Sequence, residues 1–208
     1  MLRIHKRGQV PDPRRVAVLP GTYNPPTIAH LALAERAVAM ADEVLLLLPE
    51  ILPHKDFSGV SFAARLEMLT RAVEHPRMTV ASSPGGLFLE IAEEAAERYQ
   101  GAEIALVCGR DAAQRILAWP YEDDGVLERL FAMAQLWVYA RDGAFVDQSV
   151  HAHAIRAFDF EEELQCISST EVRRKIALGD AWRALVPSHI HDDVERLYRQ
   201  QAIGPGAS

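Results

Sequence analysis

The sequence predicts an α/β protein with a doubly wound, mostly parallel sheet, helices on both faces and a small helical part at the C-terminal end. Two observations support this prediction. Short, continuously apolar runs recur along the chain, as in strands that are buried on both faces of a sheet. Segments with apolar residues at helical spacing separate these runs, and this alternation is typical of a Rossmann-like arrangement of βαβ units.

Strands are expected at the apolar runs. The first run, VAVLP, closes on Pro-Gly, and the fourth, EIALVCG, ends at Gly109. A sixth, shorter strand is expected at LQCIS. In chain order the expected strands are 16–20, 43–49, 78–82, 103–109, 135–141 and 164–168.

Helices are expected between and after these strands. Apolar residues recur at helical spacing from Ile28 to Val38, and Ser61 is placed to cap the next helix. The last two helical patterns form the C-terminal part. The expected helices are 27–41, 61–75, 87–99, 112–119, 126–134, 169–179 and 188–200.

The chain is expected to form a single domain over residues 16–200, with 168–200 as its C-terminal helical part. Residues 1–15 are polar and contain two prolines, so we expect a flexible lead-in there. Residues 201–208 are expected to be a disordered tail, and no element is assigned within 142–160. A length of 208 residues is sufficient for a full hydrophobic core.

The net charge, the lengths of the apolar runs and the cysteines limit the partners and the cellular location that we expect. The formal net charge is −7, so the chain lacks the basic character typical of nucleic-acid binding, and no nucleic-acid partner is expected. No apolar run approaches about 18 residues, so no membrane span is expected. Cys108 and Cys166 lie in apolar runs without metal-type spacing, which indicates buried thiols in the cytoplasm. The sequence leaves open whether the chain forms a homo-oligomer.

The stretch LPGTYNPPTIAH joins the first strand to the first helix. At the carboxyl end of a parallel strand, Gly21 allows a bound group to approach closely, and the following helix offers unpaired N–H groups to a phosphate. Thr27 and His30 are three positions apart, so one helical turn can present both. Taken alone, the stretch is equally consistent with a plain turn and a surface histidine.

A second stretch, ISSTEVRRKI, favours an anion site. Ser168, Ser169 and Thr170 stand at a helix start, with Arg173 one turn further on. Ser168 and Glu171 also fit a capping box. That box explains one serine and the glutamate, but not three hydroxyl residues beside arginines.

Together the two stretches resemble a known family. GTYNPPTIAH and ISSTEVR are similar to the G-x-F-x-P-x-[HT]-x-x-H and I-S-S-T-x-x-R signatures of the nucleotidyltransferase superfamily. Within it, the chain looks most like the nicotinate or nicotinamide mononucleotide adenylyltransferases. LLPEILPHK, GRDAAQRILAW and WRALVPSHIHDDV also resemble that family, so the resemblance covers about residues 16–199 with the motif order kept.

The resemblance implies transfer of AMP from ATP to a pyridine mononucleotide, with release of pyrophosphate in NAD biosynthesis. An acceptor phosphate is already anionic, so such catalysis needs positioned charge rather than a general base. His30 would donate to the α-phosphate, Arg173 would grip the β- and γ-phosphates, and Lys55 would lie on the phosphate side. Mg²⁺ would bind mainly through ATP phosphates and water, so no metal-ligating residues are expected. The positions implied for ATP are Gly21, Thr22, Tyr23, Asn24, Thr27, His30, Gly109, Asp111, Ile167, Ser168, Ser169, Thr170 and Arg173.

The same resemblance implies an acceptor site at Lys55, Gly85, Gly86, Phe88 and Trp119. Trp119 would stack on or near the pyridine, although a core tryptophan at a helix end is equally consistent. In bacterial relatives, donors for the nicotinate carboxylate come from the segment after the third strand, and SSPGGLFLE lacks their pattern here. We therefore expect nicotinate to be favoured, but with only modest selectivity over nicotinamide.

Two further departures keep alternatives open. Thr27 and Ala29 stand where the bacterial pattern has His and Gly, and the eukaryotic branch resembles this chain more closely there. One alternative is an enzyme of the same fold with another phosphate acceptor, for example phosphopantetheine. The other is a nucleotide-binding sensor without turnover. The Pro-His-Lys loop and the long C-terminal helical part favour the pyridine nucleotide acceptor over phosphopantetheine.

Overall fold

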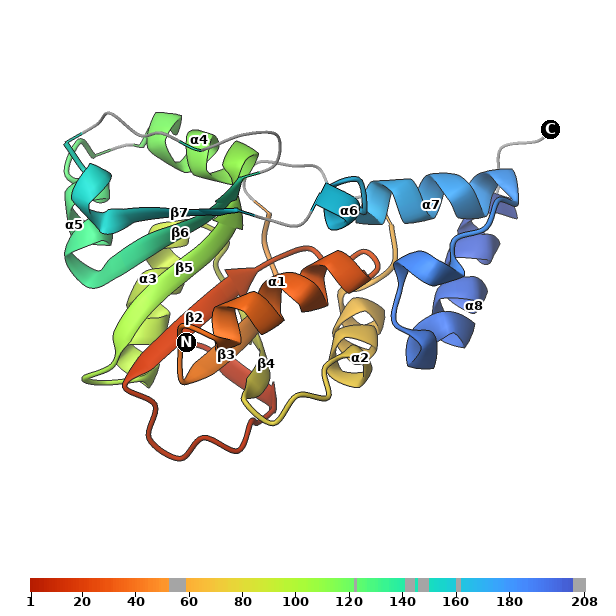
Figure 1. Ribbon diagram of the computed structural model, residues 1–208, viewed down its shortest axis with the longest axis horizontal. Helices are drawn as coiled ribbons and strands as arrows, with labels where there is room; N and C mark the ends of the chain where they lie inside the picture. The colour runs from red at the N-terminus through yellow and green to blue at the C-terminus, as the bar shows by residue number, and fades with distance from the viewer. Residues whose placement is uncertain (53–58, 122, 141–144, 146–149, 160–161, 204–208) are drawn as a thin grey trace.

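The computed structural model describes residues 1–52, 59–121, 123–140, 145, 150–159 and 162–203. Within these residues, strands form one sheet in the order β1-β4-β3-β2-β5-β6-β7. Figure 1 shows this sheet with the C-terminal helices set to one end. The strands are β1 (Arg3–Lys6), β2 (Arg15–Pro20), β3 (Glu43–Pro49), β4 (Met78–Ser83), β5 (Glu103–Gly109), β6 (Ala134–Ala140) and β7 (Ile155–Asp159).

The strand order places a crevice at the centre of the sheet. All the neighbouring strands from β4 to β7 pair in parallel, and only the edge strand β1 is antiparallel within the described sheet. The chain proceeds from β2 through β3 to β4 in one direction, then returns to β5 and continues through β6 to β7 in the other. Ligands of doubly wound sheets bind at such a reversal, which lies here between the carboxyl ends of β2 and β5.

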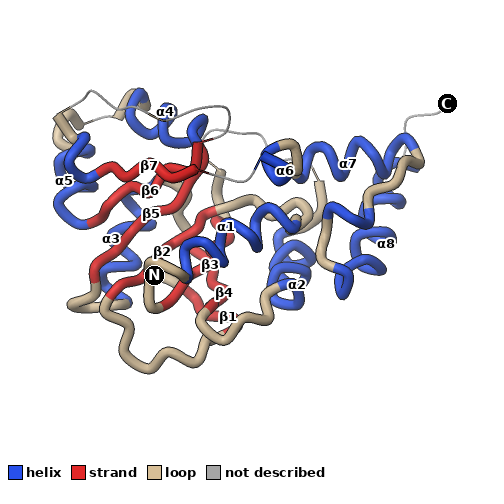
Figure 2. Tube along the Cα trace, in the orientation of Figure 1, coloured by secondary structure: helices blue, strands red, loops and turns tan. Residues whose placement is uncertain are grey.

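Helices cover both faces of the sheet (Figure 2). Apolar residues of α1 and α2 pack on one face, and those of α3, α4 and α5 pack on the other. The helices are α1 (Ile28–Val38), α2 (Phe62–Ala72), α3 (Phe88–Arg98), α4 (Arg110–Ala118), α5 (Val126–Met133), α6 (Glu162–Gln165), α7 (Ser169–Leu178) and α8 (His191–Ile203), with short 3₁₀ turns η1 (Ala152–Ala154), η2 (Arg183–Leu185) and η3 (Ser188–Ile190).

The apolar runs are continuous because the strands are buried on both faces of the sheet, as predicted. In β3, Val44, Leu46 and Leu48 belong to the core under α1 and α2, whereas Leu45 and Leu47 belong to the core under α3 to α5. Successive side chains of a strand point to opposite faces, so a strand covered on both faces must be apolar at every position. The prediction of a doubly wound, mostly parallel sheet is confirmed.

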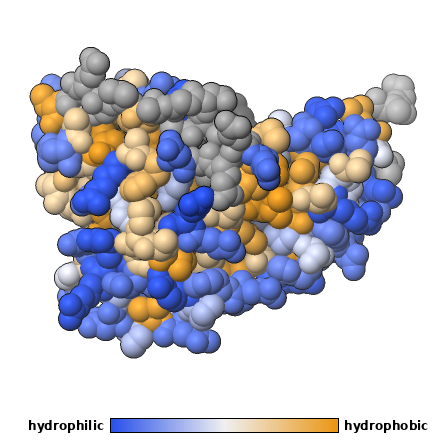
Figure 3. Space-filling model, in the orientation of Figure 1, coloured by the Kyte–Doolittle hydropathy of each residue, from blue (hydrophilic) through white to orange (hydrophobic). Residues whose placement is uncertain are grey.

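The C-terminal helices pack against α2 through a third apolar cluster. Met68 of α2 contacts this cluster together with Val172 of α7 and Val194 of α8. An ion pair between Arg71 of α2 and the mostly buried Asp193 of α8 reinforces the same junction. Figure 3 shows apolar residues where the C-terminal helices meet the rest of the molecule, and hydrophilic residues over their outer side.

Three sequence expectations are wrong, and one strand lies where the sequence analysis assigned no element. Arg3–Lys6 is not a flexible lead-in but an edge strand, and its side chains alternate between exposed and half-buried. The segment 164–168 is not a strand, because α6 ends there and α7 is capped there. The outermost parallel strand is instead β7, in a segment to which no element was assigned. Cys166 is exposed, whereas Cys108 is buried as expected.

The C-terminal boundary also differs from the expected one. Helix α8 continues to Ile203, three residues beyond the expected end of the domain. The remainder of the expected tail, 204–208, lies outside the described residues. None of the helices in the described part is long and apolar enough to cross a bilayer.

Candidate active site

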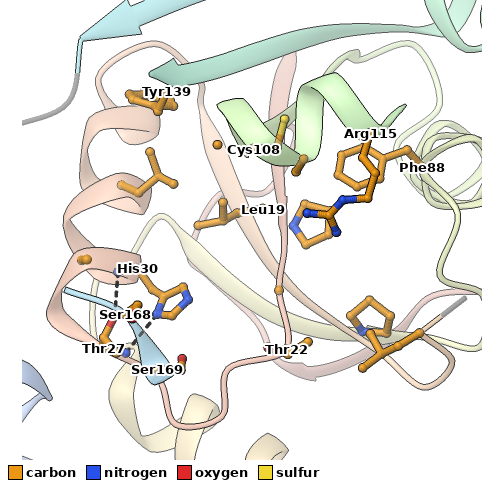
Figure 4. A pocket seen from close by; sticks show the side chains of 18 of the residues that line it. Leu19, Thr22, Thr27, His30, Phe88, Cys108, Arg115, Tyr139, Ser168 and Ser169 are labelled. Atoms are coloured by element: carbon orange, nitrogen blue, oxygen red, sulfur yellow. Dashed lines mark hydrogen bonds between the residues drawn. The ribbon is translucent and has the colours of Figure 1, made fainter. Parts of the chain in front are cut away.

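A cavity of about 330 Å³ opens at the point where the strand order reverses. Leu19 at the end of β2 and Cys108 at the end of β5 form its floor, and the first turns of α1 and α7 line it as well (Figure 4). Of the positions implied for ATP, those that line the cavity are Gly21, Thr22, Thr27, His30, Gly109, Ile167, Ser168 and Ser169.

Thr27 and His30 form a reciprocal cap at the start of α1. The backbone N–H of His30 donates to Thr27 Oγ1 at 3.4 Å, and the backbone N–H of Thr27 donates to His30 Nδ1 at 3.0 Å. Thr27 Oγ1 also lies 2.7 Å from the same ring nitrogen. The two residues therefore share one helical turn, as their spacing predicted.

This cap fixes the tautomer of His30. A backbone N–H can only donate, so Nδ1 accepts and the neutral ring carries its proton on Nε2. The ring lines the cavity and lies 5.1 Å from the buried ring of Tyr23, measured between centroids. His30 is thus not a plain surface histidine, and its Nε2–H is oriented for an acceptor such as a phosphate oxygen.

The Tyr23 side chain packs beneath the 21–26 loop, inside the protein core, and does not line the cavity. Its fully buried hydroxyl donates to the Leu19 carbonyl at 2.6 Å, and burial raises its pKa far above the ordinary value. A Cβ at Gly21 would lie 3.0 Å from the Tyr23 ring, which explains the glycine. The Gly21 N–H donates to the Leu47 carbonyl of β3 at 3.0 Å, so this amide is bound within the protein.

Donors from three distant helical positions hold the carbonyl oxygens of this loop. Each donor is at least 43 positions further along the chain, so the loop conformation depends on tertiary packing. Nη1 of Arg65 donates to Thr22 O at 2.8 Å, Oγ of Ser169 donates to Pro25 O at 2.8 Å, and Nη1 of Arg173 donates to Asn24 O at 2.6 Å.

The start of α7 combines capping with this loop contact. Ser168 Oγ accepts from the Glu171 N–H at 3.1 Å, so the capping interpretation holds for Ser168. The Glu171 carboxylate pairs with Arg174 on the exposed side, through bonds of 2.8 and 2.7 Å. Arg173 points the other way, and its Nη2 also donates to Thr170 Oγ1 at 3.2 Å. The two adjacent arginines therefore have different surroundings.

Five residues assigned to the phosphates and ATP from the sequence have different positions in the structure: His30, Lys55, Asp111, Ser169 and Arg173. His30 and Ser169 line the cavity, and Arg173 contacts the adjoining loop. Asp111 is exposed in the first turn of α4 and does not line the cavity. Lys55 lies outside the described residues. Tyr23, Asn24 and Thr170, also implied for ATP, do not line it either.

Phe88, one of the residues implied for the acceptor, lies on the opposite side of the cavity from Ser168 and Ser169 (Figure 4). Gly86 and Phe88 line it, and both also line a smaller adjoining cavity of about 70 Å³. Trp119 lines only the smaller cavity, so it is not a core tryptophan. Gly85 lines neither cavity.

The amides at the start of α3 are already engaged. The Gly86 and Leu87 N–H groups donate to Glu90 Oε2 at 2.9 and 3.0 Å, and the Gly85 N–H donates to Ser83 Oγ at 3.2 Å. The N–H groups of Gly85 and Gly86, two positions implied for the acceptor, are therefore both bound within the protein in this structure.

Sequence reasoning missed four residues around the site. Arg115 lines both cavities, and its position one turn after Asp111 and one turn before Trp119 was a usable signal. Tyr139 lines the larger cavity, and its place at the end of a predicted strand was another. Arg65 and Tyr198 act through long-range contacts for which the sequence offers no local signal.

The described lining of the cavity offers no set of protein side chains that would hold a metal ion. Among the described residues, no cluster of three or more His, Cys, Asp or Glu side chains could hold an ion. The lining supplies hydroxyls, His30 and Arg115 but no carboxylate among the residues described.

The fold and this site define a nucleotidyltransferase, and the Cytidylyltransferase-like family matches residues 18–175. A protein named "Probable nicotinate-nucleotide adenylyltransferase" from Anaeromyxobacter dehalogenans is 32% identical over 199 residues, which cover 89% of this chain and 97% of the relative. A protein of the same name from Thermus thermophilus is 31% identical over 195 residues, covering 89% and 100%. The chain belongs to the nicotinate-nucleotide adenylyltransferase family.

A solved structure shares the fold. It is entitled "Plasmodium falciparum nicotinic acid mononucleotide adenylyltransferase complexed with NaAD" and matches with a TM-score of 0.72 at 15% identity. The match covers 89% of this chain and 97% of that one. At this identity the likeness supports the arrangement of the sheet and helices.

Proposed function

We propose that this nucleotidyltransferase adenylylates nicotinate mononucleotide, with nicotinamide mononucleotide as the weaker acceptor. An acceptor phosphate oxygen attacks the α-phosphorus of ATP, the bond to the bridging oxygen breaks, and pyrophosphate leaves. The observation that carries the proposal is the oriented His30 Nε2–H in a cavity at the sheet reversal, between the starts of α1 and α7.

His30 would act as an electrophilic donor. Because Nδ1 accepts from the Thr27 N–H, Nε2–H would donate to an α-phosphate oxygen as charge develops there. No general base is required, because the acceptor phosphate is ionised at neutral pH. The main contribution of the protein is then to position the two phosphates and the histidine.

The triphosphate would lie along the starts of α1 and α7. Ser168 and Ser169 line this end of the cavity, and the positive ends of the two helix dipoles favour an anion. Arg173 would add positive charge beside the β- and γ-phosphates while it holds the 21–26 loop. Lys55 and Asp111 stay predictions. Mg²⁺ would bind through the phosphates and would neutralise part of their charge.

A panel of acceptors tests this function. Pyrophosphate release should require ATP and a pyridine mononucleotide, and it should not occur with phosphopantetheine. Turnover with phosphopantetheine would identify a different acceptor class. ATP binding without turnover on any acceptor would identify a sensor. A cytoplasmic location remains a prediction of the sequence, which fractionation would check. The oligomeric state is left open by the sequence, and light scattering would determine it.

A further inference from the structure

The smaller cavity beside the ATP site has an unusual lining. Phe88, Ile116, Trp119 and Tyr121 make it apolar and aromatic, and Arg115 is the charged residue among its described lining. It shares Arg115 and Phe88 with the larger cavity, so the two cavities adjoin at these side chains. A slot of this kind fits a flat aromatic ring that carries one negative group.

Arg115 is available to such a group. It is exposed, and within the described part of the chain it forms no ion pair or hydrogen bond. The larger cavity is lined by no other Arg, Lys, Asp or Glu among the residues described. An arginine that lines two cavities without a protein partner offers its full set of donors to a ligand.

The other place where a ligand carboxylate could bind is the start of α3, and its amides already bind a carboxylate. At the start of α3 the amides of Gly86 and Leu87 bind the carboxylate of Glu90, so the helix end carries a carboxylate from its own chain. A ligand carboxylate at that place would have to displace Glu90 and would meet its negative charge. At Arg115, by contrast, a ligand carboxylate would displace no carboxylate of the described residues.

Taken together, the two adjoining cavities have one end suited to phosphates and another end suited to a carboxylate. His30, Ser168 and Ser169 gather at one end, where the reacting phosphates fit. The aromatic side chains and Arg115 gather at the other. We infer that Arg115 binds the carboxylate of the acceptor's pyridine ring, and so selects nicotinate over nicotinamide. This inference rests on the proposed function, because it assumes a pyridine mononucleotide as acceptor.

Steady-state rates with both mononucleotides test the inference. Arg115→Gln should lower kcat/KM for nicotinate mononucleotide by about 10- to 100-fold, mainly through KM, because the lost contact is made equally in the ground state. The change with nicotinamide mononucleotide should be much smaller. Arg115→Lys should restore part of the selectivity, since it keeps the charge but loses the bidentate fork. Arg129→Gln, which removes an exposed arginine of α5, should leave both rates unchanged.

Two outcomes would overturn the inference. An equal loss with both acceptors would place Arg115 on a phosphate. An acid preference that survives Arg115→Gln but changes in Glu90→Ala would place the carboxylate at the start of α3. Equilibrium binding of each mononucleotide by calorimetry separates this question from turnover. Acid-selective binding that depends on Arg115, without pyrophosphate release, would sustain the role of Arg115 while refuting the proposed function.

Discussion

The hydroxyl of Tyr198 donates a 2.6 Å hydrogen bond to Oδ1 of Asn24, although 174 positions separate the two residues. Both side chains are buried, and burial raises the pKa of Tyr198 above its ordinary value. Arg173 holds the backbone carbonyl of the same asparagine. Residues of α7 and α8 both bind the loop that precedes His30, so the C-terminal helices support the candidate active site.

Replacing Tyr198 should lower both the stability of the fold and the activity, and a control variant separates the two effects. Tyr198→Phe leaves buried Asn24 without its donor, so we expect the free energy of unfolding to fall by about 1–3 kcal/mol. We also expect kcat/KM for ATP to fall, because the 21–26 loop loses one attachment. Tyr99→Phe is the control, since its hydroxyl bonds Glu43 at 3.2 Å at the amino end of β3. Urea denaturation and steady-state kinetics on both variants would decide this. Equal losses of activity in the two would contradict a positioning role.

The adjacent arginines of α7 provide a matched pair. Arg173→Ala should raise KM for ATP by about 10-fold or more, because it removes a loop contact and a positive charge near the phosphates. Arg174→Ala should change KM by less than about 2-fold, since Arg174 pairs with Glu171 on the exposed side. Initial rates against ATP concentration measure both. Similar KM values in the two variants would remove Arg173 from the site.

His30 should affect the chemical step more than binding. His30→Ala removes a donor aimed at charge that develops in the transition state, so kcat should fall by about 10²-fold or more. KM should change little, and circular dichroism should report an intact fold. Near-native turnover in His30→Ala would exclude the role that we assign to its Nε2–H.

The sequence predicted the parts of the fold that local patterns determine. The central strands are buried on both faces and leave continuous apolar runs, so their positions could be predicted almost to the residue. The edge strands β1 and β7 are partly exposed, and their polar positions hide the pattern. Their strand state depends on pairing with β4 and β6, which no local signal conveys.

In the candidate site, too, the sequence predicted the residues of local motifs but not those that depend on long-range contacts. Thr27, His30 and Ser169 belong to contiguous motifs at helix starts, so their types and spacing identified them. Arg65 and Tyr198 reach the 21–26 loop only because the chain folds back on itself. Gly86 was assigned to the acceptor site, but the sequence could not show that the Glu90 side chain reaches back to its amide.

Cys108 predicts how stability should respond to alkaline pH. It lies at the carboxyl end of β5 in the floor of the cavity, and burial raises its pKa from 9.0 to about 12. In the unfolded chain the thiol ionises near its ordinary value, whereas in the folded protein it stays protonated. The unfolded state therefore binds fewer protons above about pH 9, and stability present below that pH is lost progressively up to about pH 12.

The test compares the two cysteines. The free energy of unfolding of the wild-type protein, measured by urea denaturation, should fall as the pH rises above about 9, by up to about 1.4 kcal/mol per pH unit for this one group. Cys108→Ala should show a shallower fall over the same range. The buried phenols still contribute in that variant, since burial raises the pKa of Tyr139 to about 12 and that of Tyr23 further. Cys166→Ala, at an exposed position, should keep the wild-type slope. Parallel slopes for wild-type and Cys108→Ala would mean that the thiol titrates alike in the folded and unfolded states, contrary to its burial under the cavity.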